Sequence, residues 1–162
     1  MRKGEKGILI GSVVVVGLVI AVRFMMGHFD ASDDKGIPFY STASPELRMA
    51  AMKIYKQENC KNCHTLWTVR DMMRKVPAPA LDGIGSLHDE QWFYDYFSAP
   101  DPQQIVPSRL KEEFRMPSFA FLSEQERRTL AQYMASLKVE DWYFPAVKKD
   151  EYEKLTGKVF NQ

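Results

Sequence analysis

The sequence contains only two cysteines, and its charges nearly cancel. Lys and Arg number 22 against 21 Asp and Glu, and a net charge of +1 gives no reason to expect nucleic acid as a partner. Two cysteines cannot build the disulfide framework of a small secreted domain. A chain of 162 residues without internal repeats or low-complexity segments therefore predicts one compact domain with appendages.

Both cysteines lie in one short motif, Cys60-Lys61-Asn62-Cys63-His64. The pattern C-x-x-C-H is the attachment signature of a c-type haem. Two thiols add across the two vinyl groups of one porphyrin, and the histidine that follows gives an imidazole nitrogen to the iron. The motif therefore predicts one covalently attached haem c, held by Cys60 and Cys63 with His64 as an iron ligand.

Two other kinds of site use a C-x-x-C pair, namely zinc sites and thioredoxin-like dithiols. A zinc site needs further ligands, and the other histidines are His28 and His88. A redox dithiol would lie beside a βαβ pattern, which this sequence lacks. We therefore favour covalent haem and keep the dithiol as the alternative. We expect His28 to be an interfacial polar residue, and His88 to cap a helix rather than bind iron.

The longest apolar run extends from Ile8 to Met26 and contains one charged residue, Arg23. As a helix it would be about 28 Å long, close to the hydrocarbon thickness of a bilayer. Basic residues precede the run and acidic residues follow it, so the positive-inside rule leaves residues 1–7 in the cytoplasm. No A-x-A cleavage pattern follows the run. We therefore predict a transmembrane anchor over 8–26, with a cleaved signal peptide as the alternative.

Two amphipathic helices are expected to frame the domain, which begins at Pro45 after a linker over 27–44. Ser44 and Pro45 form a helix start, and Ser123 with Glu126 forms a capping box. The first helix carries an apolar stripe at Leu47, Ala50, Ala51, Ile54 and Tyr55. The second carries Leu130, Tyr133, Met134 and Leu137 and is expected to end near Lys138. Such stripes are expected to pack against each other.

Between these helices, the sequence predicts an aromatic helix over 89–97 and a short helix from Pro107 through Phe114. The stretch 77–85 is rich in proline and glycine and cannot be a regular helix. One of its carbonyls is expected to accept the other ring N–H of His64 and to fix the orientation of that ring.

Met116 is the predicted second iron ligand. A thioether is a soft ligand that raises the haem potential when it is paired with histidine. Pro117 forces Met116 into an extended turn, so its side chain projects from a loop. Met72, Met73 and Met134 are the alternatives, with Met134 expected in the core.

The last segment, 139–162, begins with the apolar stretch Trp142-Tyr143-Phe144-Pro145 and becomes charged, with Gly157 as a helix stop. Two interpretations stay open. The segment is either a strap over the domain's own surface or a docking arm for a partner subunit.

From 45 to 138 the chain resembles the class I c-type cytochromes. The resemblance rests on the C-x-x-C-H motif after the first helix, the Pro79-Ala80-Leu81 loop, the Met116-Pro117 turn and the closing helix. It implies an all-α fold around one haem, preceded here by one transmembrane helix. It also implies His64 and Met116 as axial ligands, with Pro79 (or Pro77) supporting His64 and Leu81 in the haem-binding loop.

An anchor with one such domain resembles the cytochrome c subunits of respiratory membrane complexes. The resemblance implies a one-electron carrier on the periplasmic side of the cytoplasmic membrane, with no catalytic residues of its own. Its implied partners are the membrane, other subunits of the complex, and a redox protein that donates or accepts electrons. A quinol-oxidising bc-type complex is favoured, and a nitric oxide reductase-like or terminal oxidase complex is the alternative.

A different class of function is a haem-based sensor with an open sixth coordination site, which would need a polar donor such as His88 or Tyr94. An enzyme such as a peroxidase usually needs a second haem or a distal acid–base pair. The single haem motif therefore argues against an enzyme.

Covalent attachment has a direct test. Denatured and acid-extracted protein is expected to keep its haem and to stain for peroxidase activity, because thioether bonds survive unfolding. Colourless protein, or cysteines that remain open to alkylation, would overturn the haem assignment.

Overall fold

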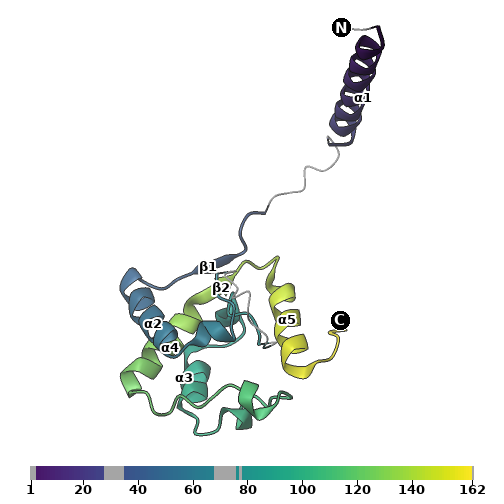
Figure 1. Cartoon of the computed structure of the whole chain (residues 1–162). Coiled ribbons are helices and arrows are strands. Elements are labelled where there is room, and N and C mark those ends of the chain that lie inside the picture. The colour runs from purple at the N-terminus through teal and green to yellow at the C-terminus, as the bar shows by residue number, and fades with distance from the viewer. Residues whose placement is uncertain (1–2, 28–34, 68–75, 77, 162) are drawn as a thin grey trace. The chain divides into compact units, whose positions relative to one another are not determined.

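The computed structural model describes residues 3–27, 35–67, 76 and 78–161, and these form two compact units, Met1–Gly36 and Ile37–Gln162. The first unit contains helix α1 (Lys3–Gly27) (Figure 1). Over the described residues, no helix combines the length and apolar character needed to cross a membrane. His28, Met72, Met73 and Pro77, named above as alternatives, lie outside the described residues.

The second unit is mostly helical, in agreement with the predicted fold class (Figure 1). Its α-helices within the described residues are α2 (Pro45–Gln57), α3 (Glu90–Ser98), α4 (Glu124–Ser136) and α5 (Phe144–Thr156). Short 3₁₀ turns connect them: η1 (Cys60–Asn62), η2 (Ile84–Ser86), η3 (Pro102–Gln104) and η4 (Glu112–Phe114).

Helix α2 begins as the sequence predicts. The Ser44 hydroxyl accepts a hydrogen bond from the Leu47 amide at 3.2 Å, and Pro45 occupies the first turn. Ala51, Ile54 and Tyr55 are buried, and Leu47 is half-buried. Ala50, which was predicted to share this stripe, is exposed. The buried face is therefore narrower than the spacing alone indicated.

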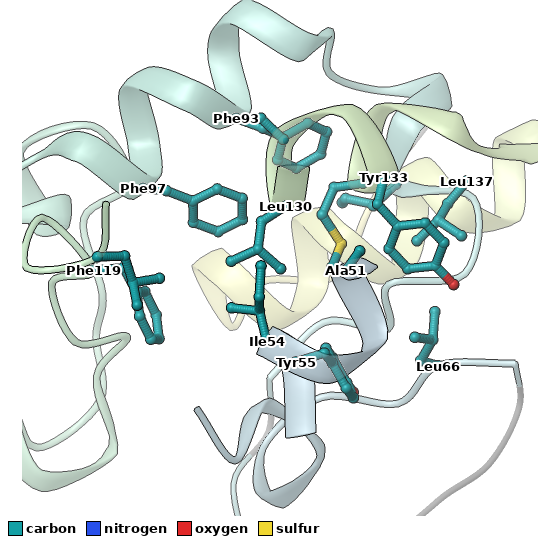
Figure 2. Packing of buried hydrophobic residues seen from close by; sticks show 14 residues of the cluster. Ala51, Ile54, Tyr55, Leu66, Phe93, Phe97, Phe119, Leu130, Tyr133 and Leu137 are labelled. Carbon is teal, nitrogen blue, oxygen red and sulfur yellow. The ribbon is translucent and has the colours of Figure 1, made fainter. Parts of the chain in front are cut away.

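Helix α4 is the central element, because both α2 and α3 pack against it. Its capping box is present: the Ser123 amide donates to the Glu126 carboxylate at 2.9 Å, and the Glu126 amide donates to the Ser123 hydroxyl at 3.3 Å. Leu130, Tyr133 and Met134 are buried, as the stripe predicts. Figure 2 shows Leu130 among Ile54, Phe93 and Phe97, and all four belong to one apolar cluster.

A short sheet interrupts the predicted all-α architecture. Strand β1 (Phe39–Ser41) pairs antiparallel with β2 (Leu137–Val139), and Phe39 lies opposite Val139. Part of the predicted linker 27–44 therefore belongs to the domain, and α4 ends at Ser136 instead of near Lys138. The physical reason is that Leu137 and Val139 alternate with Lys138, a period of two that buries one strand face.

The η2 turn packs against the carboxyl end of α4. A Cβ atom at Gly85 would overlap the carbonyl oxygens of Met134 and Ala135, so only glycine allows this close approach. The Ser86 hydroxyl accepts from the Val139 amide at 3.1 Å and joins η2 to β2. These contacts hold the 79–86 segment against the domain core.

The predicted helix from Pro107 through Phe114 does not form. Only η4 is helical there, and Lys111 before it is extended. The Ser108 hydroxyl accepts from the Leu110 amide at 3.2 Å, and this local turn competes with helix formation.

The C-terminal segment packs on the domain, and whether it also docks a partner stays open. Val147 of α5 is buried, and the Tyr143 ring meets the Phe39 ring edge-on at 5.3 Å between centroids. Helix α5 ends at Gly157, whose positive φ of 69° is the conformation that glycine adopts most easily. The predicted helix stop is confirmed.

Candidate functional site

The predicted site residues line one cavity of the second unit. Its wall includes Cys60, Cys63, His64, Pro79, Leu81 and Met116. Most of the remaining wall is apolar or aromatic and comes from η2, α3 and α4, including Ile84, Phe93, Tyr96, Phe97, Leu130 and Met134. Burial raises the pKa of Tyr96 to about 12, which shows how strongly this wall disfavours charge.

The cysteine motif reaches the cavity through a tight turn after α2. Asn59 adopts a left-handed conformation with φ of 55°, which asparagine tolerates better than most residues. The chain then forms η1, and both the Cys63 and His64 amides donate to the Cys60 carbonyl, at 3.1 and 2.9 Å. The turn thus brings Cys60, Cys63 and His64 to the same cavity wall.

Both cysteines are free thiols, so neither is used in a disulfide. Burial raises the pKa of the Cys60 thiol to about 11, with a smaller contribution from the negative charge of Glu58. Over the described residues, no group of three or more His, Cys, Asp or Glu side chains is arranged to hold a metal ion.

The His64 ring is held by a backbone carbonyl. Its Nδ1 lies 2.9 Å from the Pro79 carbonyl oxygen. Because a carbonyl can only accept, Nδ1 is the donor in this bond and carries the proton. The hydrogen bond expected between His64 and a carbonyl of the 77–85 stretch is therefore present.

Two further hydrogen bonds join the segment after His64 to the segment after Pro79. The Leu81 amide donates to the Thr65 carbonyl at 2.8 Å, and the Trp67 amide donates to a carboxylate oxygen of Asp82. We call these two bonds, together with the bond from His64 to the Pro79 carbonyl, the His64 clasp. Trp67 has a positive φ of 54°, and its indole N–H donates to the Tyr133 hydroxyl of α4 at 3.2 Å. The clasp is thereby tied to the central helix.

Asp82 and Trp67 are parts of the site that sequence reasoning missed. Asp82 is only 5% exposed, and carboxylates are rarely buried to this extent unless they have partners, as Asp82 has in the Trp67 amide. The available signal was the pair Asp82-Gly83, a turn signature inside the proline-rich stretch.

Met116 projects from the loop after η4, as predicted, and is half-buried in the cavity wall. The Gln103 side-chain amide donates to the Met116 carbonyl at 3.1 Å, and the Ser118 hydroxyl donates to the Ala99 carbonyl at 2.7 Å. These bonds fix the loop against the end of α3. Met134 also lines the cavity, but it is 4% exposed within α4, the core position predicted for it.

His88 is not the cap of α3, contrary to expectation. The cap is Asp89, whose carboxylate accepts from the Trp92 amide at 2.8 Å. The His88 ring stacks on Trp92 at 3.7 Å, and its Nε2 lies 2.7 Å from a carboxylate oxygen of Glu151. His88 therefore connects α3 to α5 and is not part of the cavity wall.

Comparison with protein families agrees with this geometry. The family model for cytochrome c matches residues 49–138, more than half of the chain. The chain belongs to the cytochrome c family. No curated protein and no solved structure matches it significantly. Family membership implies a covalently attached haem c and a function in electron transfer.

The residues present fit this cofactor. Two cysteines outside any disulfide and a histidine oriented through its Nδ1 lie on one wall, and a thioether lies in the same cavity. The apolar lining suits a porphyrin, which must be kept from water to hold its potential. Cys60 and Cys63 would hold the macrocycle, while His64 and Met116 have the right chemistry for its iron.

The clasp predicts the effect of a substitution at Asp82. Asp82→Ala leaves the Trp67 amide without its acceptor in a buried place, which is expected to cost about 1–3 kcal/mol of unfolding free energy. Asp82→Asn keeps an acceptor oxygen and is expected to cost less. Denaturant unfolding of the haem-loaded protein measures both, and equal stabilities for the alanine variant and the parent would contradict the clasp.

Proposed function

We propose that this cytochrome c is a membrane-anchored, monohaem one-electron carrier with His64 and Met116 as axial ligands. The observation that carries the proposal is the hydrogen bond from His64 Nδ1 to the Pro79 carbonyl, in a cavity that Met116 also lines. When bound, the haem supplies the ferrous–ferric couple. The protein chain orients the two iron ligands and keeps water away from the haem.

The presence of two protein ligands explains why we favour electron transfer over catalysis of a substrate reaction. With an imidazole and a thioether on the iron, no coordination position is left for a substrate. The sensor alternative needs a polar donor over an open position. The candidates His88 and Tyr94 are both absent from the cavity wall, although other polar donors such as Tyr96 and Gln103 line it. The electron carrier is therefore favoured by the pair of ligands, His64 and Met116, and the test below separates it from a sensor.

The ligand assignment is tested by Met116→Ala. Loss of the thioether is expected to lower the midpoint potential, within the range of about 0.8 V that axial ligands span, and to open the iron to carbon monoxide. Met134→Leu is the matched control, because Met134 lines the same cavity from within α4 and should leave the potential nearly unchanged. If carbon monoxide binds the parent protein as readily as the Met116 variant, Met116 is not the ligand.

The anchor and the complex are the parts of the proposal that rest on sequence. Support comes from the apolar run Ile8 to Met26 and from its flanking charges. An anchored haem domain outside the cytoplasmic membrane suits a subunit of a respiratory complex. A quinol-oxidising bc-type complex is our first choice, with a nitric oxide reductase-like or terminal oxidase complex as the second.

The anchor is tested by fractionation of the full chain after haem maturation. The parent protein is expected to stay with membranes washed in alkaline carbonate and to have the mass of the uncleaved chain. Val15→Lys combined with Leu18→Lys is expected to release it, since a lysine at the centre of a membrane helix costs about 2.5–3.5 kcal/mol. The matched control is Val15→Leu with Leu18→Val. A soluble parent, or a mass that has lost the N-terminal segment, would overturn the anchor.

A further inference from the structure

Helix α5 lies outside residues 49–138, the part of the chain that defines the family, yet it forms part of the cavity wall. Val147 is buried and Asp150, Glu151, Lys154 and Leu155 are half-buried, and these five residues share one face at helical spacing; Phe144 and Glu153 are half-buried elsewhere on the helix. Of these, Glu151, Lys154 and Leu155 line the cavity. One face of α5 is therefore directed at the haem site.

The first contact of this face is with the segment that supports His64. A carboxylate oxygen of Asp150 accepts from the Ala80 amide at 3.4 Å, one residue after the carbonyl that holds His64. A Cβ atom at Gly83 would lie 3.2 Å from a Val147 methyl group and 2.9 Å from the Val139 side chain. The segment 80–83 is thus held closely by α5 and β2.

The second contact is with the aromatic wall. Glu151 pairs with His88 at 2.7 Å, and both side chains are only about one fifth exposed, at 19% and 22%. His88 stacks on Trp92, which in turn stacks on Tyr96 at 5.2 Å between centroids. Trp92 and Tyr96 both line the cavity. A continuous set of contacts therefore runs from α5 into the wall that α3 supplies.

The third contact is at the carboxyl end of α5. A Cβ atom at Gly157 would lie 2.7 Å from the Arg109 guanidinium, so the end of the helix touches the segment that leads to Met116. That segment also lines the cavity, through Ser108 and Leu110. Helix α5 consequently contacts the supports of both predicted ligands, the Pro79 segment and the Met116 segment.

We propose that α5 is a positioning element of the haem site. Through Asp150 and Glu151 it fixes the Pro79 segment and the α3 wall, and through Lys154 and Leu155 it keeps water from the haem. The inference rests on the ligation proposed above. Because water around the haem favours the more highly charged ferric state, loosening α5 lowers the potential and makes the sixth ligand easier to displace.

The test compares Asp150→Ala, Glu151→Ala and the double variant with a control that makes the same change in charge, Glu140→Ala combined with Asp141→Ala, at two exposed positions just before the helix. The double variant is expected to have a more negative midpoint potential than the control and to bind imidazole to its ferric haem several-fold faster. Hyperfine-shifted proton resonances of His64 are expected to move as well. The single variants should show smaller changes in the same direction.

Two outcomes separate this inference from the proposed function. If the two single variants and the double variant all match the Glu140→Ala/Asp141→Ala control in potential, imidazole binding and His64 resonances, α5 is only a surface strap, while histidine–methionine ligation in the parent still stands. If the parent already lacks that ligation, the proposed function fails first. Should the double variant not fold, Asp150→Asn and Glu151→Gln make the same comparison with side-chain size preserved.

Discussion

One hydrogen bond, from the His64 ring to the Pro79 carbonyl, determines what the cavity can do. It selects the tautomer that leaves Nε2 unprotonated, and it fixes the plane of the ring. A carbonyl can hold a histidine in this way only if its own segment is held. Much of the domain serves that purpose, from the backbone bond between Leu81 and Thr65 to the buried carboxylate of Asp82.

The core explains why the two ligand segments stay in place. Helix α4 packs against both α2 and α3, and its Tyr133 hydroxyl receives the indole N–H of Trp67. The same helix presents Leu130 and Met134 to the cavity. Packing and ligand support therefore come from one element.

The sequence predicted the features that depend on local chemistry. The Ser44 cap, the Ser123–Glu126 capping box and the Gly157 helix stop are each determined by neighbouring residues, and each is present. The carbonyl contact of His64 was predictable because a C-x-x-C-H histidine needs such a partner.

Features that depend on distant pairing were not predictable. Phe39 pairs with Val139, and Glu151 pairs with His88. Both pairs are far apart in the sequence, and the periodicity of apolar residues gives no information on such distant contacts. The residues between Pro107 and Phe114 favour a helix locally, but turn contacts at Ser108 prevail. Asp82 belongs to the same group, because its role is visible only once Trp67 lies beside it.

The small sheet has a mechanical consequence. Because β1 pairs with β2 in antiparallel register, tension arriving along the chain before Phe39 is borne first by the ladder between Phe39 and Val139. The hydroxyls of Ser41 and Ser136, 3.0 Å apart, add a cross-link where the ladder meets α4. The beginning of the domain is therefore fastened to the end of the central helix, ahead of the cysteine turn.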